Sequence, residues 1–562
     1  MKKLVILLLL MSLLFSIVAC ATEAVTTTTE ATETTHQPIV ITKPAGETVE
    51  KPTDTMLNPF ETEKKPLQTE NKPVETAHPL ETTQPVPIVT KPQKPIPSEP
   101  QDGGNYPTQL DGIKDLLEDP VVEIIYVEGG NGTYTADSIW VDVETVADID
   151  AVDQQIIDRN NRIYEDLGLT IDAFTDPTLG ISGLYSFAKI YFDLQDPGLD
   201  IYAGYQYFDI SVATKGAFYN LNTIVNETGE SLININKSYW ATDYINAMTY
   251  HDQVYWVTGD LALRYTGGLY GTFVNLDLYN AYVKNNYEGK SIYDIVNEKG
   301  WTMQTMLDMA AMVYDDSDSN GAASANDRLG IVFEPNDSLD ALAFGCRINF
   351  TTTTTAANQE YISVTLHTDK NATKLATYID TMFKSNYAYC ATTSDSQEMM
   401  KIFANGNALF AVNKLYQAEI YLMGADKVAI IPTPMLDEWQ GGYATGVHDG
   451  VTIFGISRFT NCPIASAALL ELMAYYSSVM VTDAYIEELT NGSEESIAMV
   501  ELMRQSVYSN FGAAWSNKIS NMVHVFRNKA NVEKFDSFVK VTSRQWPNQL
   551  QTLLSELESL ES

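Results

Sequence analysis

The pattern of apolar and polar positions divides the chain into three stretches. Residues 4–15 form a compact apolar run behind two lysines, and residues 21–111 then show neither a helical nor a strand period. From residue 112 onward, apolar residues recur at the spacings of amphipathic helices and buried strands. We therefore expect a short leader, an unfolded segment and a large globular part.

Predicted strands alternate with predicted helices in the globular part. The strands are expected at residues 121–127, 169–174, 199–202, 254–257, 270–276, 329–333 and 428–431. The helices are expected at 149–167, where Gly168 ends the helix, at 302–314 and at 464–476, with a mostly helical tail from 501. This alternation favours α/β layers.

The globular part is too long for a single hydrophobic core. About 450 residues is more than one core usually holds, so two lobes are expected. We place lobe 1 at about 112–265 and 430–475, and lobe 2 at about 266–429 and 476–562.

The leader is shorter than the roughly 20 residues that a bilayer span needs, and it reads as a signal peptide. Its end, Ser16-Ile17-Val18-Ala19-Cys20, resembles the bacterial lipobox. That resemblance implies that Cys20 carries acyl chains such as palmitate and becomes the mature N-terminus. An ordinary signal peptide, or a short uncleaved anchor, is the alternative. We find no other stretch apolar enough to span a membrane, so the rest is expected outside the cytoplasm.

Residues 21–111 are rich in proline, threonine and glutamate, and more than half of the chain's 22 prolines fall there. Such a composition cannot bury enough apolar surface to fold. We expect a disordered tether that lifts the folded part away from the cell surface. A glycosylated stalk is the alternative.

The net charge of -38, from 73 acidic and 35 basic residues, makes nucleic-acid binding improbable, because such a surface repels phosphates. The cysteines beyond Cys20 are Cys346, Cys390 and Cys462, and their spacing indicates neither a disulfide framework nor a zinc site. We expect isolated packed thiols.

Several segments together resemble bacterial extracellular solute-binding proteins (family 1) that serve sugar ABC transporters. They are the runs at 403–410 (FANGNALF), 428–434 (VAIIPTP) and 273–279 (FVNLDLY), and Gly300-Trp301-Thr302. The resemblance implies a type II periplasmic-binding-protein-like fold, in which a hinge joins two α/β lobes around an inter-lobe cleft. It also implies a sugar ligand, ABC permease subunits as partners, and the lipid anchor that such proteins carry in Gram-positive bacteria. We expect a monomer at the outer face of the cell membrane.

Sugar recognition needs flat aromatic faces and a few directed polar groups. From their places near strand ends or lobe crossings, the ligand-binding candidates are Tyr205, Tyr207, Trp256, Asp260, Arg264, Tyr265, Tyr416, Trp439 and Asp449. Tyr416 follows the 403–410 segment, where the resemblance implies a stacking aromatic. For each candidate the alternative is a core or surface aromatic, or a solvated charge.

A second motif matches the calcium loop Asp-x-Asp-x-Asn-Gly with an acidic residue at position twelve. Its expected ligands are Asp316, Asp318, Asn320, the Ala322 carbonyl, Ser324 and Asp327. Asp in place of the usual Glu at position twelve, and Ala323 in place of a larger apolar residue, weaken the match. A solvated loop is the alternative, and a bound Ca²⁺ would be structural.

Catalytic signatures are not found: the chain has no His-Glu-x-x-His, no Gly-x-Ser-x-Gly and no P-loop motif. We therefore expect a binding protein for a sugar or oligosaccharide rather than an enzyme. The alternatives are the same fold with a peptide, polyol or other small solute, a surface glycosidase or lyase, and an adhesive or sensory protein.

Overall fold

The computed structural model describes residues 106–118, 120–126, 139, 149–174, 183–356, 359–392, 396–530 and 535–560. The predicted lipidation site Cys20 and residues 21–105 of the predicted tether lie outside these ranges.

The first sheet has the strand order β11-β3-β1-β2. Its strands are β1 (Val121–Tyr126), β2 (Thr170–Phe174), β3 (Ile201–Tyr205) and β11 (Thr452–Ile456). β1 pairs in parallel with β2 and β3, whereas β11 runs antiparallel to β3. All residues of β3 are buried, as expected for a strand covered on both faces. The chain thus returns to its first sheet near residue 452 after forming the second.

The second sheet has the order β10-β4-β9-β5-β8. Its strands are β4 (Tyr270–Asn275), β5 (Leu329–Phe333), β8 (Ala388–Cys390), β9 (Ala408–Lys414) and β10 (Val428–Pro432). β5 is parallel to β8 and β9, while β4 is antiparallel to β9 and β10. A Cβ atom on Gly330 would lie 2.3 Å from the Ala310 carbonyl oxygen, so glycine is what lets β5 approach the covering helix.

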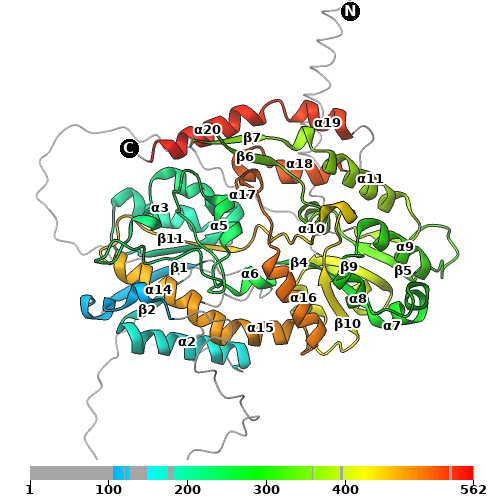
Figure 1. The fold of residues 1–562 in the computed structure, drawn as a ribbon, viewed down its shortest axis with the longest axis horizontal. Helices are drawn as coiled ribbons and strands as arrows, with labels where there is room; N and C mark the ends of the chain where they lie inside the picture. The colour runs from blue at the N-terminus through cyan, green and yellow to red at the C-terminus, as the bar shows by residue number, and fades with distance from the viewer. Residues whose placement is uncertain are drawn as a thin grey trace, which may run out of the picture. The chain divides into compact units, whose positions relative to one another are not determined.

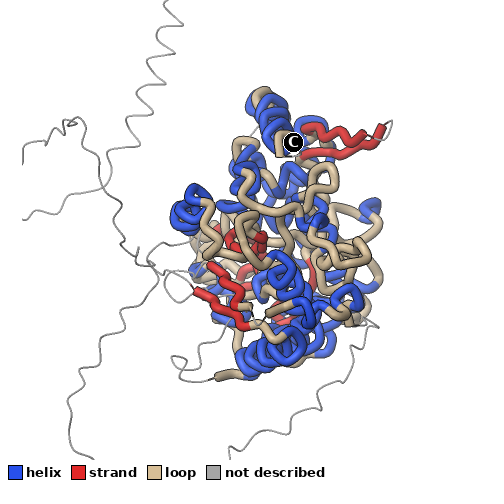
Figure 2. The backbone as a smooth tube through the Cα atoms, turned by 90° about the vertical axis from the view of Figure 1, so that its left-hand side faces the viewer, coloured by secondary structure: helices blue, strands red, loops and turns tan. Residues whose placement is uncertain are grey.

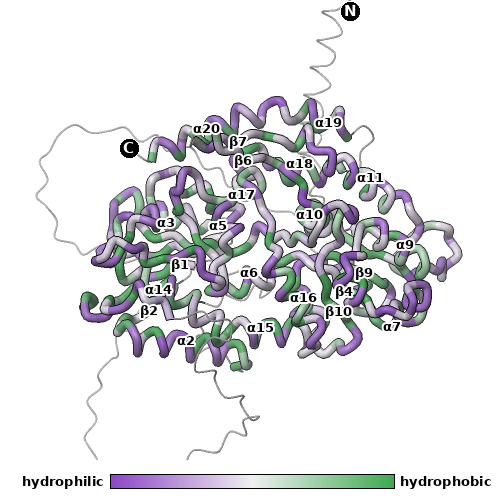
Figure 3. The backbone as a smooth tube through the Cα atoms, in the orientation of Figure 1, coloured by the Kyte–Doolittle hydropathy of each residue, from purple (hydrophilic) through white to green (hydrophobic). Residues whose placement is uncertain are grey.

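The helices of the two lobes pack on these sheets (Figure 1). α2 (Ala151–Leu167) and α14 (Pro463–Tyr476) pack together beside the first sheet, and α3 (Leu184–Leu194) precedes β3. On the second sheet, α9 (Met303–Val313) packs on β5, α12 (Gln397–Ala404) on β9 and α16 (Glu494–Gln505) on β10. Apolar residues gather around β1, β11 and α14, while α2 alternates apolar and polar positions (Figure 3).

The remaining elements are mostly short. The helices are α4 (Gln206–Asp209), α5 (Thr242–Met248), α6 (Leu263–Gly267), α7 (Leu276–Leu278), α8 (Ile292–Asn297), α10 (Asp337–Gly345), α11 (Lys370–Lys384), α13 (Gln417–Tyr421), α15 (Thr482–Leu489), α17 (Phe511–Ala514), α18 (Met522–Lys529), α19 (Phe535–Thr542) and α20 (Trp546–Glu558). The 3₁₀ and π turns are η1 (Thr108–Leu110), η2 (Ile113–Leu116), η4 (Ile210–Lys215), η5 (Leu221–Thr223), η6 (Tyr279–Val283), η7 (Lys284–Tyr287), η8 (Leu366–Thr368), η9 (Glu438–Gln440), η10 (Ser477–Val481) and η11 (Ser516–Lys518).

The C-terminal helices contact both lobes. α17 packs on α5, α18 on α10, α19 on α11, and α20 on η4 (Figure 1). They also contact the two-stranded hairpin of β6 (Thr351–Ala356) and β7 (Gln359–Val364), which extends from the body of the fold (Figure 2). The C-terminal segment therefore spans the junction between the lobes.

The predicted helix at 149–167 is confirmed as α2. The Asp150 side chain accepts a hydrogen bond from the Asp153 N–H at 2.8 Å, and Gly168 ends the helix with a φ of 70°. The predicted helix at 464–476 is confirmed as α14, which is buried almost all round. Such burial explains its uniformly apolar sequence.

One expectation about membrane spans is corrected. The helical stretch Pro463–Leu489 is long and apolar enough to cross a bilayer by composition. However, 78% of its most apolar window is buried inside the fold. The stretch is therefore a core helix of the folded part.

The predicted strand at 254–257 is wrong. Val257 makes a single antiparallel bridge to Phe454 of β11. The neighbouring Trp256 side chain is buried, and its ring nitrogen donates a hydrogen bond to the Ile210 carbonyl at 3.1 Å. The apolar run reflects burial rather than a strand ladder, two causes that a short sequence pattern does not separate. Cys346, Cys390 and Cys462 are free thiols, as predicted.

Candidate ligand-binding site

A pocket lies where strand ends of the two sheets meet. It is lined by Gln206, Tyr207, Tyr244, Tyr270, Asp340, Phe344, Val447, Asp449, Ser509, Ala513, Ala514, Ser516 and Val523. The first two follow β3, Val447 and Asp449 precede β11, and Tyr270 opens β4. Ends of strands between lobes are a common position for ligands.

The C-terminal segment forms one wall of this pocket. The Gln206 side chain donates to the Ala514 carbonyl, and the Asn517 side chain donates to the Tyr207 carbonyl. The Tyr207 hydroxyl donates to Asn521 Oδ1 at 3.1 Å. In this conformation the pocket has room for little more than one water molecule, so a larger ligand requires its walls to separate.

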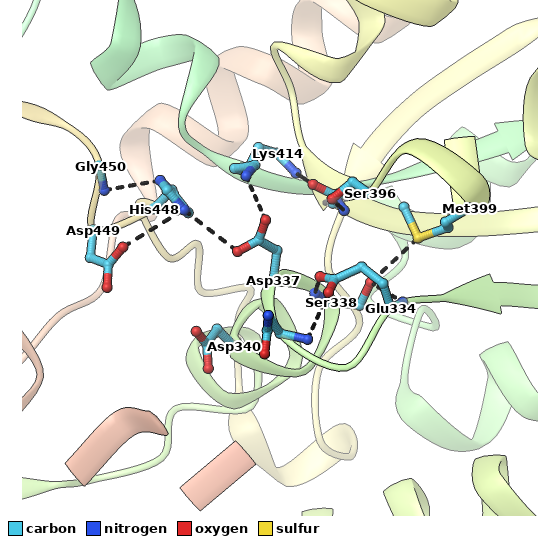
Figure 4. A network of polar contacts seen from close by, with 12 residues as sticks. Glu334, Asp337, Ser338, Asp340, Ser396, Met399, Lys414, His448, Asp449 and Gly450 are labelled. Carbon is cyan, nitrogen blue, oxygen red and sulfur yellow. Dashed lines mark hydrogen bonds and ion pairs between the residues drawn. The ribbon is translucent and has the colours of Figure 1, made fainter. Parts of the chain in front are cut away.

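A polar network joins the second lobe to the segment before β11 (Figure 4). Asp337 Oδ2 lies 2.5 Å from Lys414 Nζ, and Asp337 Oδ1 lies 3.5 Å from His448 Nε2. Burial opposes the charge on Asp337, but Lys414 and His448 hold the pKa of this carboxyl well below its usual range. Lys414 ends β9 and Asp337 opens α10, so the network fixes two edges of the site.

Glu334 orients the start of α10 (Figure 4). Its carboxylate oxygens accept hydrogen bonds from the Ser338 N–H at 2.8 Å and from the Asn336 N–H at 2.7 Å. These bonds hold the first turn of the helix that carries Asp337 and Asp340.

Asp449 lies between two imidazoles. Its Oδ1 is 3.7 Å from His448 Nε2, and its Oδ2 is 3.6 Å from His524 Nε2. The His524 ring stacks on Tyr207 with centroids 5.0 Å apart. Burial opposes the charge on Asp449, yet the two histidines lower the pKa of this carboxyl.

Asp340 completes the charged side of the pocket. Its Oδ2 lies 2.5 Å from Arg527 Nη1 on α18. Burial, with the nearby negative charges of Asp449 and Asp337, raises the pKa of Asp340 to about 8 although Arg527 opposes the rise. The carboxyl therefore holds a proton over part of the neutral pH range.

Two of the predicted ligand residues, Tyr207 and Asp449, line the pocket. Three others meet close to Lys414: the Arg264 guanidinium lies 5.6 Å from the Tyr205 ring centroid and 5.8 Å from that of Tyr416. This stack joins the end of β3 to the end of β9, and Lys414 Nζ lies 5.0 Å from the Tyr416 ring.

The other four candidates lie apart from the pocket lining, as far as the described residues define it. The Trp256 ring packs on Phe218 with centroids 4.5 Å apart, in the core of the first lobe. Asp260 pairs with Arg504 at 2.8 Å, and the Arg504 guanidinium lies 5.9 Å from the Tyr265 ring. Trp439 is 83% exposed in η9.

Sequence reasoning missed most of the lining. Gln206 of the lining and His448 of the neighbouring network stand directly beside predicted residues, so a wider choice around Tyr207 and Asp449 would have included them. Asp340 and Arg527 carried no such signal, because their pairing depends on the packing of α18 against α10.

The predicted calcium loop brings together three carboxylates. Oxygens of Asp316, Asp318 and Asp327 lie within 4.8 Å of one another. The buried Asp327 accepts hydrogen bonds from the Ser317 N–H at 2.9 Å and the Ser324 N–H at 2.8 Å. Hard oxygen donors of this kind suit Ca²⁺. Calcium binding by this loop stays a prediction.

Comparisons with known proteins show the class of fold. No protein-family model matches the chain, and no curated protein matches it. The extracellular solute-binding protein from Staphylococcus aureus, solved with maltose, superposes with a TM-score of 0.50 at 12% identity, covering 77% of this chain and 98% of that chain. This likeness confirms a two-lobed α/β fold of the type II periplasmic-binding-protein class.

Two further structures show a lower likeness. The GacH receptor of Streptomyces glaucescens has a TM-score of 0.48 at 11% identity, covering 76% of this chain and 99% of that chain. An ABC transporter associated binding protein from B. animalis subsp. lactis Bl-04, solved with β-1,6-galactobiose, has a TM-score of 0.47 at 10% identity, covering 78% of this chain and 98% of that chain.

Proposed function

We propose that this chain captures a carbohydrate between its two lobes and passes it unaltered to the permease subunits of an ABC importer. The observation that carries the proposal is the pocket itself, where tyrosines and carboxylates from both lobes converge at strand ends. Tyrosine rings pack against the C–H faces of a sugar, and carboxylates accept hydrogen bonds from its hydroxyl groups. The maltose held by the Staphylococcus aureus protein of the same fold supports a sugar as the ligand.

Capture would proceed by separation and closure of the lobes. The sugar enters when the walls separate, and it stabilises the closed form only as far as it binds that form more tightly. The contact from Asp337 of the second lobe to His448, in the segment before β11, would then close over the ligand. In this proposal the protein makes and breaks no covalent bond.

The predicted anchor completes the proposal. Acylation at Cys20 and the proline-rich residues 21–111 would hold the folded part, as a monomer, at the outer face of the membrane. In a bacterial host, Cys20→Ser should move the protein from the membrane fraction to the medium and abolish palmitate labelling. A protein that stays in the membrane without label would contradict the lipid anchor.

Thermal unfolding of the purified chain tests ligand capture. A ligand that binds the native state alone raises the melting temperature, and about 2.7 kcal/mol is gained at a concentration 100 times Kd. We expect at least one of maltose, maltotetraose and β-1,6-galactobiose to raise it. A shift with peptides and none with sugars would replace the proposed ligand, and release of shorter sugars would indicate an enzyme.

A further inference from the structure

One carboxylate oxygen in the pocket lacks a partner. Asp340 is 4% exposed and lines the pocket, and among the described residues its Oδ1 has no hydrogen bond. The other oxygen, Oδ2, is held by Arg527. A buried acceptor without a partner calls for an explanation, and a bound ligand or water that donates to it is the usual one.

Asp209, at the end of α4 in the first lobe, provides a comparison. It is 1% exposed, and its Oδ2 also has no hydrogen bond among the described residues. Its Oδ1 accepts from the Tyr202 hydroxyl at 2.8 Å. Asp209 is not among the residues that line the described pocket, so a ligand there would not reach it.

The charges around the pocket restrict the ligand. Its described lining holds two carboxyls, those of Asp340 and Asp449, and no lysine or arginine. Behind the lining, Arg527 forms an ion pair with Asp340, and Lys414 forms an ion pair with Asp337. An anionic ligand would therefore meet Asp449 without a free permanent cation to offset its charge.

We propose that Asp340 anchors the ligand through Oδ1, and that the pocket selects glycans that bring hydrogen-bond donors without a negative charge. Neutral and amine-bearing sugars fit this description, and uronic acids and sugar phosphates do not. The inference rests on the proposed function, because it names the class of sugar that the same site would take.

Binding should then release a proton. The raised pKa of Asp340, about 8, reflects first its burial and then the charges of Asp449 and Asp337, against Arg527 from α18. A hydroxyl or ammonium that donates to Oδ1 favours the ionised carboxylate, so affinity should rise between about pH 6 and pH 8. Tyr270 from β4 faces the same group, and His448 and His524 act on it through Asp449.

Titration calorimetry of the full chain in detergent tests the class of ligand. The probes are β-1,6-galactobiose and maltotetraose as neutral sugars, the glucosamine dimer as an amine, and digalacturonate as an acid. We expect the acid to bind at least 100-fold more weakly than the best neutral or amine-bearing sugar. Equal binding of digalacturonate would overturn the inference and leave sugar capture intact, whereas no binding by any sugar would overturn both.

Two further readouts test Asp340 itself. Asp340→Asn should weaken the best sugar about 10- to 100-fold, as expected for loss of a charged hydrogen bond, and should abolish the rise of affinity with pH. Asp209→Asn, of equal burial, should stay within about twofold of the parent. Titrations of the parent chain in buffers of different ionisation enthalpy should show proton release without any substitution. Unchanged affinity in Asp340→Asn, or no proton release, would overturn the inference.

Discussion

Two buried aspartate–arginine pairs join C-terminal helices to the rest of the fold, and their surroundings differ. Asp260 pairs with Arg504 of α16, and Asp340 pairs with Arg527 of α18. Both aspartates are 4% exposed. Arg504 also donates to Thr266 Oγ1 at 2.7 Å and lies over Tyr265, whereas Asp340 lines the pocket.

The surroundings change the protonation of the two carboxyls. Burial raises the pKa of Asp260 to about 6 against the opposing effect of Arg504. Burial raises the pKa of Asp340 to about 8, and the negative charges of Asp449 and Asp337 add to the rise, as those of Glu501 and Asp483 do at Asp260. The ion pair of Asp260 thus lies within the packed fold, whereas that of Asp340 borders the pocket.

The largest expected effect comes from breaking the pair of Asp260 and Arg504, called here the packed pair. Arg504→Met leaves Asp260 buried without its partner, which should lower the free energy of unfolding by about 3 to 5 kcal/mol at pH 7. Urea denaturation measures the loss. Arg458→Met, at an exposed arginine, is the matched control and should change the free energy by less than about 0.5 kcal/mol. A loss below about 1 kcal/mol for Arg504→Met would contradict a structural role of the pair.

The pH dependence of stability separates the two aspartates. A carboxyl with a raised folded-state pKa binds more protons in the folded state, so its contribution is full below about pH 4 and is lost as the pH rises through the folded pKa. Asp260 should complete this loss near pH 6, and Asp340 near pH 8. Between about pH 6 and pH 8, the ionisation of Asp340 alone should lower the free energy of unfolding of the parent chain by about 2 to 3 kcal/mol.

Urea denaturation at pH 6, 7 and 8 measures this difference. The parent should lose stability relative to Asp340→Asn across this range, while its difference from Asp260→Asn should stay nearly constant. The same slope for both variants would show that the two carboxyls do not differ in protonation.

Breaking the pair of Asp340 and Arg527 at the pocket, called here the pocket pair, should lower the free energy of unfolding less than breaking the packed pair. Arg527→Met leaves Asp340 beside a pocket that water can enter, so the free energy of unfolding should fall by about 1 to 2 kcal/mol. The double variant with Asp340→Asn should recover part of this loss, because no buried carboxyl without its arginine partner remains. If Arg527→Met lowered the free energy of unfolding as much as Arg504→Met, the result would contradict the idea that the pocket lessens the effect of losing the arginine.

The calcium loop supplies the smallest expected effect, at a site separate from both pairs. Millimolar Ca²⁺ should raise the free energy of unfolding by about 1 kcal/mol, and a chelator should reverse the gain. Asp327→Asn should abolish the response by weakening the site that Asp316 and Asp318 share. A melting temperature that ignores both Ca²⁺ and the chelator would contradict the prediction.

Elements with strong local signals could be predicted from the sequence. The cap at Asp150, the glycine at 168 and the helical period between them predicted α2, and the apolar run at 464–476 predicted α14. The sequence between residues 254 and 257 carried the composition of a strand but forms one bridge, because its burial comes from packing on β11. Two lobes were expected from the length of the globular part, and the type II class followed from the resemblance of ordered segments rather than from any single motif.

The site was predicted less completely, for a physical reason. Tyr207 and Asp449 follow or precede strands of the first sheet, and position at a strand end is visible in a sequence. Trp256 carries the same kind of ring as a sugar-stacking residue, yet Phe218 covers it in the core. The contact between Asp340 and Arg527 joins residues 187 positions apart, and a sequence alone does not show which helix faces which.

Calorimetric titration of the chain with neutral oligosaccharides, followed by chromatography of the recovered sugar, tests the central claim most directly. The account predicts saturable binding of one sugar per chain and recovery of that sugar intact. Heat from peptides but from no sugar, or recovery of shorter sugars, would contradict it.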